Sequence, residues 1–369
     1  MNMPSAPAAE GKGPLFDFSA NMIMLNRKKC IVVMNNETCC GFLLYGITAS
    51  DKKRLQEMLE AGLRNMLAAE NISESVIDRY IADCTFPATF CKTANRSAVA
   101  KLNHFCQRVE RFLDCFDPED QLQTILLPLF NDDIKMVENG KTVFSTYEKQ
   151  EHLFRERYGT LYNCRAGIFD VSLELETPCV RRVMIPMVFP LFYLHDIIQN
   201  LFLWKDCHLH EFILKKSKNG RPLQIAKLPS PDDEDYFSAN GCSVHDERDI
   251  TLSEVFSTNK SIVYEYDFGD GWMHEIRLID VIDDADIPAP VCTELKGDAP
   301  PEDCGGPGGF AEFVRILNDP QNPQHNELVE WNGGSSIIQK NIKWINSTLR
   351  RRYLAGAFHL YYTIDYDDE

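Results

Sequence analysis

The sequence predicts an α+β protein of two domains, each a small, mostly antiparallel sheet with packed helices. Its 369 residues exceed what one hydrophobic core usually organises, which favours two domains. Hydrophobic residues make up 44% and aromatic residues 11% of the chain, a composition typical of globular proteins. Runs of apolar/polar alternation are interleaved with helical periodicity, and this pattern restarts at Phe169 after a less regular segment.

These patterns divide the chain into five parts. We expect a disordered tail over 1–15, a first α+β domain over 16–116, a partly helical bridge over 117–160, a second domain over 161–355 and an acidic, aromatic tail over 356–369. The bridge has an apolar periodicity of its own, which favours a packed connection over a flexible linker.

The first domain begins with two or three strands between Ser19 and Leu44, with turns at Asn26–Lys28 and Asn35–Asn36. A helix follows, because apolar side chains recur at helical spacing over 55–67, and Thr48 or Ser50 could cap its start. Two more helices are expected, one over 73–81 and a longer one from 97 to the proline at 118.

The second domain alternates strands and helices in a comparable way. Strands are expected over 169–176, 178–185, 208–214 and 223–228, the last two joined by a turn at Asn219–Gly220. Helices are expected over 191–202, 251–256, 310–317, 324–331 and 337–353, and an acidic loop over 232–235.

The most informative stretch of this domain runs from Val263 to Leu278, two alternating runs around a Gly-Asp-Gly turn that predict a β-hairpin. A two-residue or four-residue loop gives one register, with Phe268 opposite Met273 and Asp267 opposite His274. A three-residue loop would place His274 opposite Tyr266 instead. In the first register, Asp267 can hydrogen-bond His274 across the hairpin.

The net charge of −17 is concentrated in one region. From Pro229 to Cys304 the chain holds 20 acidic against 4 basic residues, a balance of −16, so the remainder is close to neutral. Affinity for nucleic acids comes mostly from Lys and Arg that displace counterions, so direct nucleic-acid binding through this region is disfavoured.

The cysteine pattern and the distribution of apolar residues indicate the redox state and the cellular compartment of the protein. The thirteen cysteines are odd in number and scattered, without a framework spacing, which favours reduced thiols. No apolar run reaches the length of a membrane span, and the N-terminus lacks the pattern of a signal peptide, so we expect a cytoplasmic protein without a membrane partner.

Three blocks of the second domain carry a resemblance to a known family. They are Trp204-Lys-Asp-Cys-His-Leu-His-Glu-Phe212, Tyr264-Glu-Tyr-Asp-Phe-Gly-Asp-Gly-Trp-Met-His-Glu-Ile276 and Pro300-Pro-Glu-Asp-Cys-Gly-Gly306. Their order and spacing resemble the plasmid pRiA4b ORF-3-like family, also labelled TnpR-like passenger proteins of insertion elements. The resemblance implies an α+β domain encoded near mobile elements in bacteria, without an activity that carries over.

The first domain resembles an uncharacterised bacterial domain that often precedes such a module. Three sequence stretches carry this resemblance: Leu25-Asn-Arg-Lys-Lys-Cys30, Asn35-Asn-Glu-Thr38 and Cys91-Lys-Thr-Ala-Asn-Arg-Ser97.

Four residues of the second domain could carry chemistry: His208, His210, Asp267 and His274. A carboxylate that holds an imidazole fixes its tautomer and raises its basicity, as a general base or a metal ligand requires, which makes Asp267 and His274 the catalytic candidates. The alternative is that these groups stabilise a sheet and a turn. Binding candidates are His208, His210, Asp270 and Trp272.

A second combination is Cys292 and Cys304 with His208 and His210 as metal ligands, although twelve positions between the cysteines is not a zinc-knuckle spacing. The glycine-rich segment after Cys304 could hold a phosphate, but Glu302 and Asp303 would repel it, which favours a tight structural loop.

No Walker motif, dinucleotide fingerprint, nucleophile elbow or HExxH zinc motif occurs in the sequence. We therefore expect a protein-binding or adaptor module whose partner is another protein, with no cofactor assigned. The alternative is a metal-dependent hydrolase that uses His208, His210, Asp267 and His274 with a divalent metal.

Overall fold

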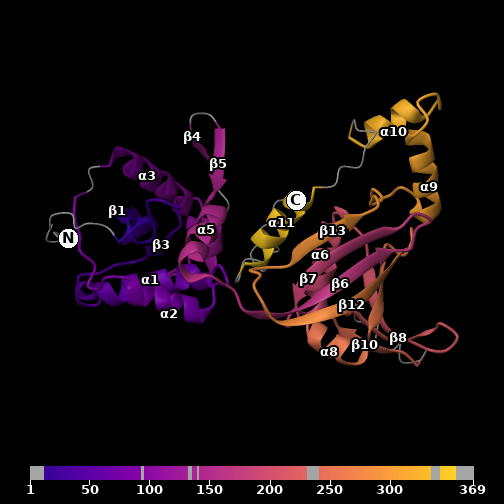
Figure 1. The fold of residues 1–369 in the computed structure, drawn as a ribbon, viewed down its shortest axis with the longest axis horizontal. Coiled ribbons are helices and arrows are strands. Elements are labelled where there is room, and N and C mark those ends of the chain that lie inside the picture. The colour runs from indigo at the N-terminus through magenta and orange to yellow at the C-terminus, as the bar shows by residue number, and fades with distance from the viewer. Residues whose placement is uncertain are drawn as a thin grey trace. The chain divides into compact units, whose positions relative to one another are not determined.

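The computed structural model describes residues 12–92, 95–131, 135–138, 141–230, 241–333 and 341–354. The chain forms two compact units, the first comprising residues 1–163 with 351–369 and the second residues 164–350 (Figure 1). Both units combine sheet and helix, so the predicted two-domain α+β class is confirmed. No described helix has the length and apolar character of a membrane-spanning segment.

The first unit is built on a three-stranded antiparallel sheet in the order β1-β2-β3. The strands are β1 (Phe18–Leu25), β2 (Lys28–Asn35) and β3 (Gly41–Leu44). Asn26 and Arg27 both have positive φ, which is the backbone of a tight two-residue hairpin turn. The turn predicted at Asn26–Lys28 is therefore present.

Three helices accompany this sheet: α1 (Leu55–Ala68), α2 (Glu74–Asp83) and α3 (Arg96–Glu110). Neither Thr48 nor Ser50 caps α1, because Ser50–Lys53 forms a 3-10 turn and Arg54 stands at the N-cap. The helix predicted from residue 97 ends at Glu110 and not near Pro118, since a separate 3-10 turn follows at Leu113–Cys115.

The predicted bridge contains α4 (Leu127–Phe130), the two-stranded pair β4 (Lys135–Glu138) and β5 (Lys141–Ser145), and α5 (Thr146–Tyr158). Leu127, Phe130 and Phe154 belong to the same buried cluster as the strands and helices of the first unit. This segment therefore forms part of the core of the first unit. The turn expected at Asn139–Gly140 lies outside the described residues.

The second unit is organised around an eight-stranded sheet in the order β10-β9-β8-β11-β12-β6-β7-β13 (Figure 1). Its strands are β6 (Cys164–Leu173), β7 (Cys179–Pro186), β8 (His210–Lys216), β9 (Pro222–Lys227), β10 (Ser243–Asp246), β11 (Ser261–Tyr266), β12 (Trp272–Ala285) and β13 (Val291–Lys296). All neighbouring strands pair antiparallel except β9 and β10, which run parallel. Strands β10 and β13 were not predicted from the sequence.

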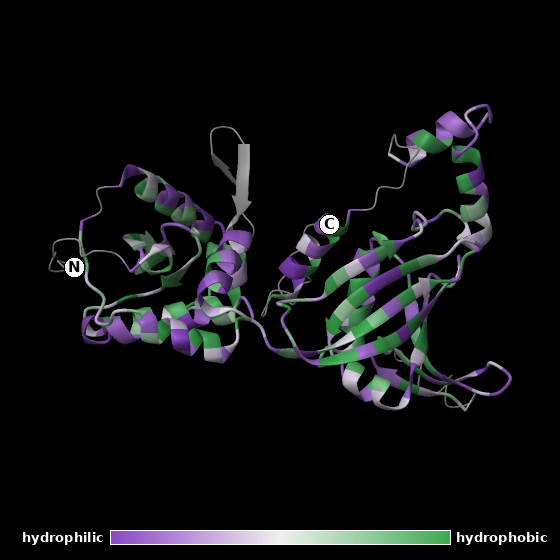
Figure 2. Ribbon diagram, viewed as in Figure 1, coloured by the Kyte–Doolittle hydropathy of each residue, from purple (hydrophilic) through white to green (hydrophobic). Residues whose placement is uncertain are grey.

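One face of this sheet is buried beneath α6 (Leu191–Phe202), as the alternation of hydrophobic and hydrophilic residues along the strands indicates (Figure 2). The ring of Phe202 lies 4.7 Å from that of His274, and the Arg181 guanidinium donates to the Leu201 carbonyl at 3.1 Å. The end of helix α6 therefore packs against strands β7 and β12.

The observed hairpin register differs from both predicted registers. Tyr264 pairs with His274 and Tyr266 with Trp272, which leaves a five-residue loop over 267–271. Asp267 has a left-handed backbone (φ 54°), and its Oδ1 accepts hydrogen bonds from the N–H groups of Gly269 and Asp270 at 2.9 and 3.3 Å. Since Asp267 closes the turn in this way, it cannot stand opposite His274, and the predicted pairing is wrong.

Within the described residues the second unit also contains the α-helices α8 (Leu252–Thr258), α9 (Gly306–Leu317) and α10 (His325–Trp331), and α11 (Ile342–Tyr353) begins in it. Thr251 begins α8 with a capping box closed by Glu254. The acidic loop over 232–235 and the tail over 356–369 lie outside the described residues.

Candidate functional site

The three sequence blocks meet around Trp204, Tyr266 and Glu302. The Trp204 ring stacks on the Tyr266 ring with centroids 5.0 Å apart, and its Nε1–H donates to the Pro300 carbonyl at 2.8 Å. The Tyr266 hydroxyl donates to Glu302 Oε1 at 2.7 Å. Segments far apart in the sequence are therefore joined at one end of β8 and β11.

The segment between α6 and β8 is held in a fixed conformation. Leu203 and Asp206 both have left-handed backbones, with φ of 64° and 59°. The Lys205 N–H donates to Glu302, the Asp206 N–H to Gln199 Oε1, and the Cys207 N–H to the Tyr266 hydroxyl, each at 3.0 Å. These bonds fix the positions from which Asp206 and His208 project.

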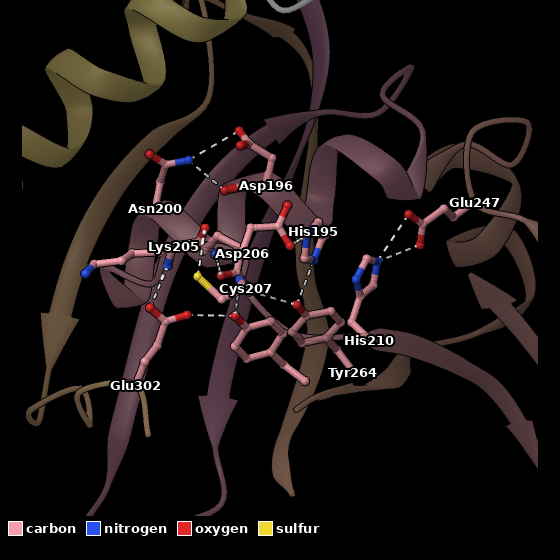
Figure 3. A network of polar contacts seen from close by, with 12 residues as sticks. His195, Asp196, Asn200, Lys205, Asp206, Cys207, His210, Glu247, Tyr264 and Glu302 are labelled. Carbon is pink, nitrogen blue, oxygen red and sulfur yellow. Dashed lines mark hydrogen bonds and ion pairs between the residues drawn. The ribbon is translucent and has the colours of Figure 1, made fainter. Parts of the chain in front are cut away.

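A buried polar network lies beneath this segment (Figure 3). His195 on α6 has only 1% of its side chain exposed; its Nε2 lies 2.8 Å from Asp206 Oδ1 and its Nδ1 lies 2.7 Å from the Tyr264 hydroxyl. Gln199 Nε2 also donates to that hydroxyl, at 3.1 Å. Helix α6, the 203–207 segment and β11 thus each contribute to one hydrogen-bonded group.

His210 continues this network from β8. Its ring stacks on the ring of His195, with centroids 3.5 Å apart and planes 6° from parallel. Its Nε2–H donates to both carboxylate oxygens of Glu247, at 3.1 and 3.0 Å, and the Glu247 side chain is fully buried. Burial, followed by the neighbouring His195, lowers the pKa of His210.

A second group opens to solvent at the hairpin turn. His208 Nε2 lies 3.2 Å from Asp303 Oδ1 and 3.7 Å from Asp267 Oδ2. Asp303 is 70% exposed, whereas the Nε2 atom of His208 is shielded from solvent and has no hydrogen-bond partner among the described residues. Each of the three blocks contributes one residue to this group.

The four residues of the predicted constellation do not form one group. His208 and Asp267 come together with Asp303, while His210 joins His195 and Asp206. His274 belongs to neither of these groups within the described chain. It is fully buried, its Nδ1–H donates to the Trp272 carbonyl at 3.2 Å, and burial lowers its pKa to about 3. Its surroundings are those of a core residue.

The predicted cysteine ligands also lie apart from these groups. The backbone of Cys292 on β13 is bonded by the side-chain amide of Asn346, which donates to its carbonyl and accepts from its N–H. Burial raises the pKa of the Cys304 thiol to about 12. Neither cysteine joins a metal-capable group in the described part of the chain.

Asp270 and Trp272, the predicted binding residues of the hairpin, both make structural contacts. Asp270 Oδ2 accepts from the Gly305 N–H at 3.2 Å, and a Cβ on Gly306 would stand 2.5 Å from the Asp270 carbonyl oxygen. Trp272 is buried, with 1% exposed. The glycine-rich segment therefore packs against the hairpin turn, which agrees with the structural loop favoured by the sequence.

Sequence reasoning missed His195, Asp206 and Glu247. His195 lies on the apolar stripe of its helix, four residues after Leu191 and three before Ile198, so a polar residue at a core-facing position was a usable signal. Asp206 lies inside the first block. Glu247 carried no such signal, because strand β10 itself was not predicted.

Two family models match the chain, one in each of the two units. Residues 166–346 match the family model described as plasmid pRiA4b ORF-3-like protein, and residues 1–145 match a domain of unknown function, DUF6933. The uncharacterized protein y4hQ of Sinorhizobium fredii (strain NBRC 101917 / NGR234) is 37% identical over 168 residues, which cover 45% of this chain and 79% of that protein. The crystal structure of a protein of unknown function from Methanosarcina mazei Go1 aligns with 27% identity and a TM-score of 0.42, over 48% of this chain and 96% of that chain. Through its second unit, the chain belongs to the plasmid pRiA4b ORF-3-like family.

Proposed function

We propose that the second unit binds a divalent metal ion at His208, Asp267 and Asp303 and uses it for metal-assisted hydrolysis. The observation that carries this proposal is the position of His208 Nε2, which is shielded from solvent and lies at ion-pair distance from two carboxylates, 3.2 Å from Asp303 and 3.7 Å from Asp267, without a hydrogen bond of good geometry to either. A buried imidazole nitrogen normally finds a hydrogen-bond partner, so this one requires an explanation.

The spacing of the three side chains supports a shared ion. Ligands about 2.1 Å from a tetrahedral metal stand roughly 3.4 Å from one another. The distances of 3.2 Å to Asp303 and 3.7 Å to Asp267 bracket that value. One imidazole with two carboxylates suits borderline ions such as Mn²⁺, Fe²⁺ or Zn²⁺.

The exposure of the group supports catalysis more than a purely structural role. Catalytic metals keep a coordination position for water, whereas structural metals are closed by protein ligands. Three protein ligands, one of them 70% exposed, leave room for that water. A metal ion held in this way would activate a bound water for hydrolysis. The proposal therefore keeps the hydrolase alternative, with His208, Asp267 and Asp303 as the ligands.

The test is Mn²⁺ binding to the metal-free full chain, measured by isothermal titration calorimetry for wild type, Asp303→Asn and Asp283→Asn. Asp283 is exposed and acidic but lies on β12, outside the group, so its substitution is the control. We expect Asp303→Asn to weaken one binding event by at least about tenfold and to abolish any Mn²⁺-dependent hydrolysis of p-nitrophenyl esters and phosphodiesters, with the control unchanged. Equal affinity in wild type and Asp303→Asn would contradict the proposal.

The second candidate function is the protein-binding or adaptor role. Leu209 is 74% and Phe268 48% exposed. Their backbones lie near each other, because the N–H of Asp267, the residue before Phe268, donates to the Leu209 carbonyl at 2.9 Å. Large apolar side chains exposed together at a turn are a common feature of protein interaction sites.

This role can be tested by affinity capture of partner proteins on three immobilised forms of the chain: wild type, the double variant Leu209→Ser/Phe268→Ser and the control Val188→Ser. The amount of each partner protein retained by each form is measured. Val188 is also largely exposed, so it controls for the loss of an apolar surface residue in general. A partner retained by wild type and the control but lost from the double variant would support the adaptor role; equal retention by all three would argue against it.

A further inference from the structure

The open group formed by His208, Asp267 and Asp303 has aromatic residues on both sides of one of its members. Tyr266, which precedes Asp267, is buried, and its ring lies 5.8 Å from the ring of His208. Phe268, which follows Asp267, is 48% exposed. Asp267 therefore stands between an aromatic ring that packs against His208 and one that is open to solvent.

Hydrogen bonds fix the turn that carries Phe268. Asp267 Oδ1 accepts from the N–H groups of Gly269 and Asp270, at 2.9 and 3.3 Å. The other carboxylate oxygen, Oδ2, is the one that lies 3.7 Å from His208 Nε2. One carboxylate thus closes the turn with one oxygen and faces the open group with the other, so the backbone of Phe268 is held next to the proposed ion.

The charges around the open group disfavour an anionic substrate. The three sequence blocks together contain eight acidic residues and one basic residue, Lys205. Among the described residues, only His208 offers a cationic group within ion-pair distance of Asp267 or Asp303. Sites for phosphate esters usually supply arginine or lysine to the phosphate oxygens. A divalent ion at the open group would no more than balance its two carboxylates.

The start of α9, close to the open group in the sequence, is also unsuited to a phosphate. Helix N-termini bind anions through backbone N–H groups. At this helix the N–H of the N-cap residue Gly305 donates to Asp270 Oδ2 at 3.2 Å, and Asp303 lies two residues before the cap. A carboxylate of the chain itself therefore takes the place of an external anion.

We propose that the substrate of the open group is a neutral carboxylic ester whose acyl chain packs on Phe268, and not a phosphate ester. This inference rests on the proposed metal-assisted hydrolysis and names its substrate class. Water bound at the ion attacks the ester carbonyl carbon, and the bond from that carbon to the alcohol oxygen breaks. The water supplies its hydroxyl to the acid and its second proton to the alcohol, so the products are one carboxylic acid and one alcohol.

The test compares p-nitrophenyl acetate, butyrate and hexanoate with bis(p-nitrophenyl) phosphate as substrates of the Mn²⁺-loaded full chain. The rate with Asp303→Asn under the same conditions is the background for each substrate. Because a longer acyl chain buries more apolar surface against Phe268, kcat/KM should rise from acetate to hexanoate, by up to roughly fourfold for each methylene buried. Hydrolysis of the phosphodiester should stay at the background rate.

Three variants assign the chain-length preference to Phe268. Phe268→Ser should abolish it, Phe268→Leu should keep most of it, and Val188→Ser should keep all of it. Val188 is 72% exposed and controls for the loss of an apolar surface residue. Isothermal titration with Mn²⁺ and thermal melting of each variant check that the ion and the fold are retained.

The outcomes separate this inference from the function on which it rests. Mn²⁺-dependent phosphodiester hydrolysis, or ester hydrolysis that does not depend on chain length or on Phe268, would overturn the inference and leave metal-assisted hydrolysis standing. In that case the exposed ring of Phe268 would be left to the protein-binding role. Mn²⁺ affinity that Asp303→Asn does not weaken, or a Mn²⁺-loaded chain that hydrolyses none of the four substrates, would refute both.

Discussion

His274 shows how the fold uses a histidine that the sequence presented as catalytic. Its ring lies among aromatic side chains, 5.4 Å from the rings of both Trp204 and Tyr264, and it is fully buried. Alternation along the hairpin was correctly recognised, but the loop length decides which residues face each other, and an Asp that closes a turn leaves no trace in hydrophobic periodicity. The core position of His274 therefore emerged only from the observed register.

The lowered pKa of His274 predicts a pH dependence of stability. Burial lowers its folded-state pKa to about 3 from an ordinary value of 6.5. Between these two pH values, His274 is therefore mostly protonated in the unfolded chain and mostly neutral in the folded chain. The stabilisation is complete above pH 6.5 and is lost as pH falls towards 3. Between pH 7 and pH 5 the loss from this residue should be on the order of 2 kcal/mol.

Urea unfolding of wild type and His274→Phe at pH 7 and pH 5 measures this loss. The variant keeps an aromatic ring of similar size but does not titrate. We expect its free energy of unfolding to fall less than that of wild type by about 2 kcal/mol. Equal losses in both proteins would show that His274 is not the group responsible.

At the scale of elements, the hairpin and the glycine-rich segment behave as one packed unit. Gly306 begins α9 with φ of 69°, and an added Cβ would stand 2.5 Å from the Asp270 carbonyl oxygen. Gly308, two residues later in the same helix, has open space around it. The sequence indicated a tight loop here, but not its contact, because nothing local to residues 304–309 encodes the position of Asp270.

These two glycines make a matched pair for mutation. Gly306→Ala should lower the free energy of unfolding by roughly 1 to 3 kcal/mol through the positive φ and the backbone clash. Gly308→Ala should leave it unchanged or raise it by up to about 1 kcal/mol, because alanine favours the helix. Chemical denaturation of both variants checks the pair; similar effects would mean that the close approach of Gly306 to Asp270 does not matter.

Other elements mark the limits of sequence reasoning in the same way. The helix α6 and the strand β7 were predicted close to their observed places, because their periodicity is strong, whereas β6 begins five residues before and ends three residues before the strand predicted over 169–176. The short strands β10 and β13 lack such alternation and owe their conformation to pairing with β9 and β7. Glu247, which follows β10, was missed for this reason.

At the scale of the whole molecule, the two units each have a sheet and buried side chains of their own. We predict that they unfold independently. Limited proteolysis should cut the chain near the boundary at residue 163, and calorimetry of the cut protein should show two separate transitions. A single transition in the cut protein, or an uncut chain under conditions that degrade each half alone, would count against independence.

The divalent-ion site that we propose joins one residue from each of the three family blocks, His208, Asp267 and Asp303. The most direct test is anomalous diffraction at the manganese edge from crystals of the full chain grown with Mn²⁺. We predict an anomalous peak about 2.0 to 2.3 Å from His208 Nε2, Asp267 Oδ2 and Asp303 Oδ1. A well-ordered site without such a peak, with these three side chains clearly visible, would contradict it.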